Sequence, residues 1–121
     1  MRTILFLLLF SSALLYAQEN KSYQKGANLY FAEGCANCHG TNAEGSSYYP
    51  RLAHRRQKVL IKKLQDFKNG IADTQKQEIM FTFVKPLSQQ DMEDITYYLS
   101  HFKKENTDKY KVEDDLLGVD Y

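Results

Sequence analysis

The six residues CANCHG, at positions 35 to 40, constrain this chain more than any other stretch. Two cysteines stand three residues apart, and a histidine follows the second one directly. A disulfide between Cys35 and Cys38 would close so short a loop that it would remove little conformational entropy from the unfolded chain. Stabilisation by a disulfide therefore explains the pair poorly, and a chemical role has to be considered.

Three chemical roles compete for this motif. A thioredoxin-like redox pair belongs beside a βαβ pattern, and no strand–helix–strand alternation is visible in the sequence. A structural zinc site needs about four ligands, whereas His39 is too close to Cys38 to serve easily as a separate one. Covalent haem attachment has Cys-x-x-Cys-His as its signature. We therefore predict one haem c, bonded through thioethers to Cys35 and Cys38, with His39 as a ligand of its iron.

The N-terminus has the layout of a secretory signal peptide. It carries one cation, Arg2, then an apolar run from Ile4 to Phe10, and a small residue, Ala17, before polar sequence begins. The stretch 3–17 is shorter than the roughly 20 apolar residues that a membrane-spanning helix needs. We expect cleavage after Ala17, export to the periplasm and no membrane span in the mature chain. Retention of the segment as an anchor is the alternative.

The charge balance limits the classes of partner. Without Arg2 the mature chain has 15 basic and 15 acidic side chains, so it is close to neutral. An exported protein without a net positive field is a poor candidate for binding nucleic acid. The basic run within residues 51–63 is expected to be a solvated face. We predict a signal peptide at residues 1–17, one monomeric domain at 18–102 and a polar, solvated tail at 103–121, which could alternatively dock on the domain or on a partner.

The second axial ligand of the iron has two candidates once Met1 is removed. Met92 belongs to a predicted helix from Ser88 to Phe102, where it shares an apolar stripe with Leu99, so core packing is its expected role. Met80 lies in a stretch without sustained helical period that runs into Pro86. Such a loop could fold over a ring and present a thioether, and we predict Met80 as the distal ligand. His54 and His101 are expected to be surface imidazoles.

The rest of the mature chain has helical periodicity. We predict a first helix from about Ser22 to Glu33, ended by Gly34, and a second from about Arg56 to Lys68, ended by Asn69-Gly70. The third is the Ser88–Phe102 helix, with Ser88 and Asp91 at capping-box spacing. The predicted fold class is all-α, with three main helices packed around one haem.

The chain resembles the class I c-type cytochromes, particularly the small bacterial ones such as cytochromes c4, c5 and c553. CANCHG carries the resemblance, together with the segment PRLAHRRQKVLIKKLQDFKNG at residues 50–70, the position of Met80 and the segment LSQQDMEDITYYLSHF. The resemblance implies that the Pro50 carbonyl accepts a hydrogen bond from His39 and that Leu52 packs on the haem face. It also implies that Gly26 lets the first and last helices cross closely.

Three departures from the family pattern concern the propionates of the haem, and one of them is the absence of an arginine that relatives often have just after Gly70. His54-Arg55 stands where relatives often have Gly-Gln, and Val59 replaces a tyrosine. The propionate contacts therefore stay open among four residues: Tyr48, Tyr49, Arg55 and Arg56.

A covalent haem clamped by His39 and Met80 leaves no position for a substrate. We therefore expect a one-electron carrier rather than an enzyme, with redox proteins such as a respiratory complex, an oxidase or a dehydrogenase as partners. The alternatives are an electron-transfer subunit that stays bound to a redox enzyme, and a haem enzyme or gas sensor with an open sixth position.

Overall fold

A computed structural model describes residues 2–104 of the chain, with side chains from residue 15 onward. Nearly all of the predicted tail, residues 105–121, lies outside the described residues. The elements are α1 (Arg2–Ala32), α2 (Ala36–His39), α3 (Gln57–Lys68), the 3-10 helix η1 (Gln75–Ile79), α4 (Met80–Val84) and α5 (Gln89–Ser100). No strand occurs within residues 2–104, so the all-α prediction is confirmed.

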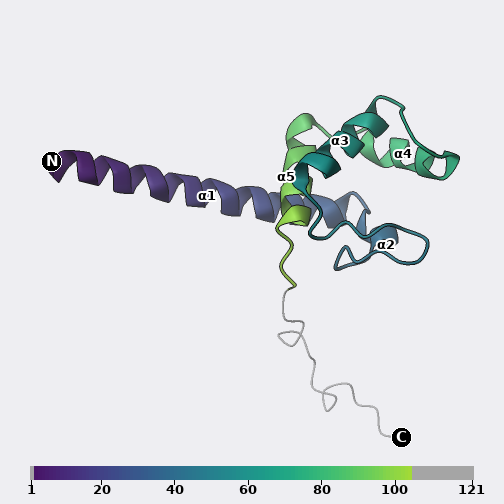
Figure 1. Cartoon of the computed structure of the whole chain (residues 1–121), viewed down its shortest axis with the longest axis horizontal. Coiled ribbons are helices and arrows are strands. Elements are labelled where there is room, and N and C mark those ends of the chain that lie inside the picture. The colour runs from purple at the N-terminus through teal and green to yellow at the C-terminus, as the bar shows by residue number, and fades with distance from the viewer. Residues whose placement is uncertain (1, 105–121) are drawn as a thin grey trace, which may run out of the picture.

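The crossing of α1 with α5 organises the fold (Figure 1). Gly26 makes the close approach possible, because an added Cβ at this position would meet the Asp94 carbonyl and lie 2.8 Å from the Cβ of Tyr98. Beside this contact the rings of Tyr30 and Tyr98 pack with their centroids 5.7 Å apart. Tyr30 is fully buried. Gly26, which the family resemblance assigned to this crossing, therefore lies at the point of close approach.

Helix α1 is longer than predicted. It begins at Arg2 rather than near Ser22, and it continues beyond its crossing with α5 (Figure 1). The reason is local: neither glycine nor proline occurs between Arg2 and Lys25, and leucine and alanine, which favour helices, are frequent in this stretch. No helix within the described residues is both long and apolar enough to cross a membrane.

Helices α3 and α5 each begin within one residue of the predicted start, and α3 ends at Lys68 as predicted. Helix α5 ends at Ser100, two residues before the predicted Phe102. Ser88 is the N-cap of α5: its hydroxyl accepts from the Asp91 backbone N–H, and the Asp91 carboxylate accepts from the Ser88 N–H, which completes the capping box. Just after the C-terminal end of α3, Gly70 has a φ of 73°, a left-handed conformation that glycine adopts without steric cost.

The prediction of a loop around Met80 is wrong. Residues Gln75–Ile79 form η1, and Met80 is the first residue of α4. Both elements are five residues long, too short to produce a periodic pattern in the sequence. The Met80 N–H donates to the Gln77 carbonyl, so the methionine is joined directly to η1.

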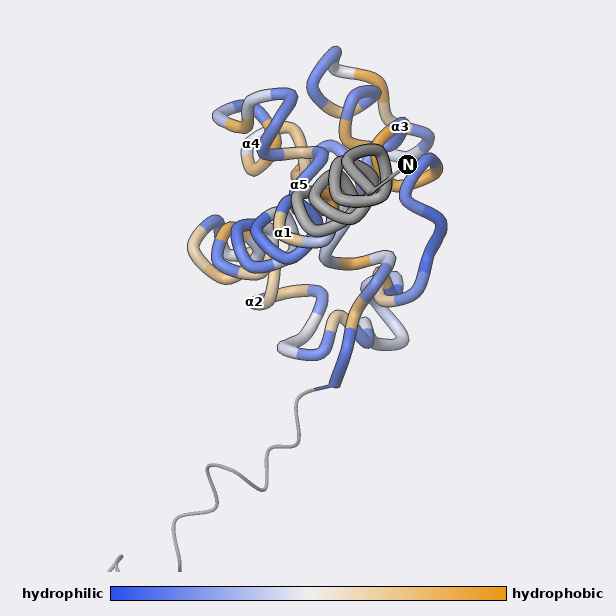
Figure 2. Tube along the Cα trace, turned by 90° about the vertical axis from the view of Figure 1, so that its left-hand side faces the viewer, coloured by the Kyte–Doolittle hydropathy of each residue, from blue (hydrophilic) through white to orange (hydrophobic). Residues whose placement is uncertain are grey.

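The helices enclose a small core. In Figure 2, α3 and α4 lie on one side of the α1–α5 pair and α2 lies on the other. Buried side chains from α1, α3, α4, α5 and the intervening loops make one cluster; its larger members are Tyr30, Leu60, Phe67, Val84, Leu87, Met92, Ile95, Tyr98, Leu99 and Phe102. Met92 is 2% exposed, which confirms the prediction that it packs in the core.

Candidate functional site

Both cysteines and the histidine of the motif lie on a single helical turn. Cys35 is the residue before α2, and Cys38 and His39 are within it. The turn is closed by a hydrogen bond from the His39 N–H to the Cys35 carbonyl, 3.0 Å long. Both thiols are free; Cys35 is half-buried and Cys38 is exposed. A contiguous motif on one turn thus presents two reactive sulfurs next to an imidazole.

A hydrogen bond orients that imidazole. The Nδ1 of His39 lies 2.9 Å from the Pro50 carbonyl oxygen. Because a carbonyl oxygen can only accept, Nδ1 carries the proton, and Nε2 of the neutral ring keeps its lone pair. The His39 side chain is buried, and no other described residue forms a hydrogen bond with its ring. The site therefore contains an oriented nitrogen donor of the kind that metals bind.

The loop between α2 and α3 holds Pro50 in place by backbone hydrogen bonds. The Ala43 carbonyl accepts from the N–H groups of Leu52 and Ala53, at 2.9 and 3.0 Å. The Gly45 N–H donates to the His39 carbonyl at 2.8 Å, which returns the loop to the end of α2. Leu52 is partly buried against the core. The loop thereby fixes Pro50 beside the imidazole of His39, eleven positions earlier in the chain.

Tyr30 adds support from α1. Its hydroxyl donates to the carbonyl of Gly40, the residue after His39, over 2.7 Å. Burial raises the pKa of Tyr30 well above its ordinary value, so the hydroxyl keeps its proton for this bond. The sequence carries no signal for this hydrogen bond.

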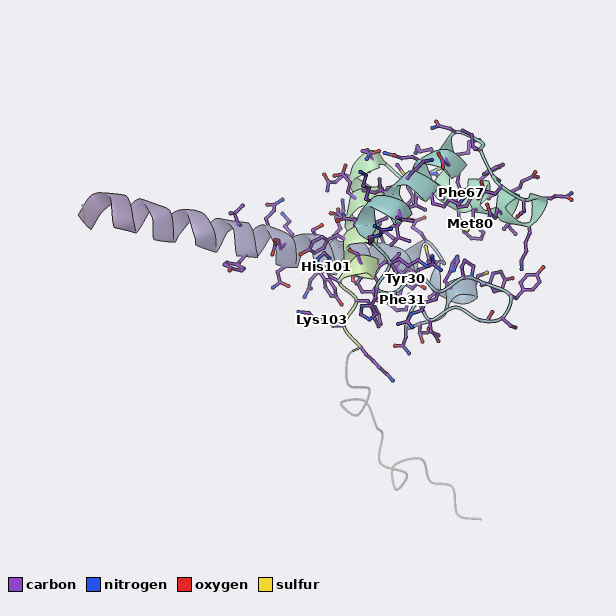
Figure 3. The ribbon with its side chains drawn as sticks, viewed as in Figure 1. Tyr30, Phe31, Phe67, Met80, His101 and Lys103 are labelled. Carbon is purple, nitrogen blue, oxygen red and sulfur yellow. The ribbon has the colours of Figure 1, made fainter. Side chains whose placement is uncertain are left out.

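Met80 reaches the same core from the opposite side. Figure 3 shows Phe67 and Met80 on the α3–α4 side, and Tyr30 and Phe31 on the side of α1 and α2. Met80 is partly buried and packs against the core cluster, as do Leu52 and Phe81. Phe81 in turn contacts Phe67, with ring centroids 6.2 Å apart. The fold therefore places the Met80 segment and the His39 segment on opposite sides of the core.

These residues fit a covalent haem. The two thiols and the imidazole are provided in the order that attachment requires, and the nitrogen that would face a metal has no partner among the described residues. The half-buried apolar side chains on either side of the core suit an apolar disc. A cluster of three or more His, Cys, Asp or Glu side chains, as a purely protein-bound metal would need, is absent from the described residues.

Of the four candidates for the propionate contacts, Tyr48 and Tyr49 pack on each other, with ring centroids 5.0 Å apart. Arg55 donates to the Arg51 carbonyl at 2.7 Å, and Tyr48 and Tyr49 contact Lys76 instead of an arginine. His54 and His101 are exposed, as expected. His54 has a φ of 63°, so it occupies the left-handed position that the family's glycine would favour. Lys76 was not singled out by the sequence, because a lone lysine outside any periodic element gives no signal.

Comparison with known proteins identifies the same class of site. The family model described as Cytochrome c matches residues 23–103. Cytochrome c-554(547) of Halothiobacillus neapolitanus is 35% identical over 86 residues, which cover 64% of this chain and 93% of that protein. Cytochrome c-552 of Acidithiobacillus ferridurans is 32% identical over 85 residues, or 69% of this chain and 36% of that protein. Cytochrome c4 of Stutzerimonas stutzeri is 34% identical over 76 residues, 57% of this chain and 36% of that protein.

The chain belongs to the cytochrome c family. It spans about a third of the length of two of these relatives and nearly the whole of the third. Family membership confirms the predicted cofactor, a covalently bound haem c with its iron, and Cys35 and Cys38 stand at the CXXCH position.

Proposed function

We propose that the protein is a periplasmic one-electron carrier whose haem iron is bound by His39 and Met80. The observation that supports this most directly is the hydrogen bond between His39 Nδ1 and the Pro50 carbonyl. It leaves Nε2 as a lone-pair donor on the same turn as the two cysteines. The bound haem would supply a one-electron couple, and the protein would set its potential and its access to partners.

His39 would be the proximal ligand, and Pro50 would support it. A ligand histidine that donates its second ring nitrogen to a carbonyl is fixed in tautomer and orientation, and its basicity rises. Leu52, two residues after Pro50 and partly buried, would pack on the haem face.

Met80 would be the distal ligand because it is the methionine that remains accessible. Met92 is 2% exposed and lies within the core, whereas Met80 is only partly buried and lies at the start of a short helix. A methionine opposite a histidine raises the reduction potential. With both axial positions taken by protein, the site would pass electrons to redox partners without binding a substrate.

Cys35 and Cys38 would hold the porphyrin through thioethers. Burial raises the pKa of the Cys35 thiol to about 11, so at neutral pH it is protonated. Addition of an S–H group across a vinyl group needs both the sulfur and a proton, so no external oxidant is required.

Residues 1–17 would direct export to the periplasm and be removed. The polar contacts that join α1 to α5 begin at Ser22, five residues after the proposed cleavage site. Mass spectrometry of the protein purified from the periplasm would test this, and a chain that still begins at Met1 would contradict cleavage.

The ligation is tested by absorption of the ferric holoprotein. Methionine sulfur bound to ferric haem gives a weak charge-transfer band in the red. We expect this band in the native protein and its loss in Met80→Ala, which should also bind carbon monoxide when reduced. Met92→Leu is the matched control, because it changes the other methionine and should keep the band. Persistence of the band in Met80→Ala would show that Met80 is not the ligand.

A further inference from the structure

Lys76 makes an unusual set of contacts for an exposed lysine. Its ammonium lies 3.1 Å from the centroid of the Tyr48 ring and donates to the Tyr48 carbonyl oxygen over 2.6 Å. The ring of Tyr49 is 5.9 Å away. A cation over an aromatic face is attracted by the ring's quadrupole. One side chain is thus held by a ring and a carbonyl of the same residue.

The partners of Lys76 belong to the loop that supports His39. The hydroxyl oxygen of Ser46 accepts from the N–H groups of Tyr48 and Tyr49, each at 3.1 Å, and the Ser46 N–H donates to the Tyr49 carbonyl at 2.8 Å. This turn leads directly into Pro50, whose carbonyl binds His39. The Tyr49 ring also lies edge-on to the His39 ring, with centroids 6.2 Å apart. Lys76 therefore contacts a hydrogen-bonded turn on the proximal side.

Lys76 itself belongs to the distal side. It lies in η1, four residues before Met80, and η1 is hydrogen-bonded into the start of α4. Among the residues that the structure describes, Lys76 makes the one hydrogen bond that joins residues 40–53 to residues 70–84. Residues 40–53 support His39 and residues 70–84 carry Met80, and these two segments are otherwise linked through the core.

We propose that Lys76 is a positioning residue that holds the Met80 segment against the loop supporting His39. This contact of Lys76 with Tyr48, called the clasp below, keeps the sixth iron position closed to external ligands. The proposal rests on the proposed His39 and Met80 ligation. An external ligand can reach the iron only when Met80 leaves it. Its apparent affinity is therefore the intrinsic affinity multiplied by the fraction of open molecules. A contact made only in the closed form lowers that fraction.

The test is a titration of the ferric holoprotein with imidazole, followed by loss of the red charge-transfer band. Lys76→Met keeps the length of the side chain and removes its charge and its N–H donors. We expect it to bind imidazole about five to ten times more tightly than the native protein, which corresponds to the loss of one cation–π contact and one hydrogen bond. Lys76→Arg keeps the charge and N–H donors, and it should bind imidazole nearly as weakly as the native protein does.

Two controls make the result specific. Lys58→Met introduces the same change on α3, away from both ligand segments, and should leave the titration unchanged. Tyr48→Leu removes the ring but keeps the carbonyl, and should give an intermediate increase. Equal imidazole affinity in Lys76→Met and the native protein would overturn the clasp. If instead the native protein has no red band, or Met80→Ala keeps it, the proposed ligation fails, and this outcome is distinct from failure of the clasp.

Discussion

At the scale of single residues, Gly26 has little freedom to change. It is buried where α1 meets α5, and a Cβ there would collide with the Asp94 carbonyl and the Tyr98 side chain. Backbone atoms of a helix cannot move aside without separating the helices. Glycine, which has no Cβ, is therefore the residue that this crossing accommodates.

We expect Gly26→Ala to lower the free energy of unfolding by about 3 kcal/mol, the upper range for overpacking a tight interface. Chemical denaturation followed by circular dichroism measures it. Gly70→Ala is the control: it has a φ of 73° but no atom within 4 Å of an added Cβ, so only local strain is added. Its cost should be about 1 kcal/mol. Equal losses in the two variants would contradict the crowding argument.

At the scale of the elements, a buried carboxylate joins α1 to α5. Asp94 is 3% exposed and accepts from the Ser22 hydroxyl at 2.6 Å and from the Gln90 amide at 3.1 Å, and Lys25 pairs with it at 3.1 Å. Burial by itself would raise the pKa of Asp94, but the hydrogen bonds from Ser22, Lys25 and Gln90 outweigh it and leave the pKa below its ordinary value. The ionised form therefore stabilises the fold.

This shift sets the sign of a pH effect. A carboxyl group whose pKa is lower in the folded state stabilises it above the ordinary value, about 3.9 for aspartate, and the stabilisation is lost as pH falls through the folded pKa. We expect Asp94→Asn to cost about 2 kcal/mol near pH 7, the range for hydrogen bonds to a charged group. It should also weaken the fall of stability below about pH 4.

Thermal unfolding monitored by circular dichroism across this pH range measures the effect. Asp73→Asn is the control, since its ion pair with Lys63 lies on the surface and such pairs contribute little. An acid limb with the same slope in Asp94→Asn and the native protein would refute the assignment to Asp94.

At the scale of the whole molecule, the core is small and leaves much apolar surface exposed. Several large apolar side chains remain about half exposed, among them Phe31 at 50%, Val59 at 46% and Ile71 at 56%. Domains of this size bury a limited fraction of their apolar surface and usually need a disulfide, a metal or a cofactor for stability. A covalently bound haem c meets that need.

We therefore expect the chain made without haem attachment, for example as Cys35→Ser/Cys38→Ser, to lack a cooperative thermal transition and to elute from gel filtration as an expanded species. The native holoprotein is the reference. Cooperative unfolding of the haem-free chain at a temperature close to that of the holoprotein would contradict this role of the cofactor.

A second prediction at this scale concerns the N-terminal part of α1. A holoprotein that begins at Gln18 keeps Gly26, Tyr30 and the Ser22–Asp94 hydrogen bond. Its melting temperature should therefore stay within about 4 °C of that of the full chain, less than about 1 kcal/mol for a domain of this size. A larger fall would mean that residues before Gln18 contribute to the folded core.

The sequence alone was sufficient where the determinants are contiguous. CANCHG specifies haem attachment because the two thiols and the imidazole need only one helical turn to be brought together. Ser88 and Asp91 predict the start of α5 because both partners of the capping box are three residues apart. Met92 follows from the same helix's apolar period.

Contacts between distant segments were decided by the tertiary structure. The family resemblance suggested Pro50, but the path of the loop through Ala43 and Gly45 is what brings its carbonyl to His39. The short helices η1 and α4 have no sequence period, so the setting of Met80 could not be read from the sequence. The contact of Lys76 with Tyr48 spans 28 positions, and nothing local to either residue encodes it. Interactions between neighbouring residues can be predicted from the sequence, whereas contacts between distant residues depend on how the whole chain packs.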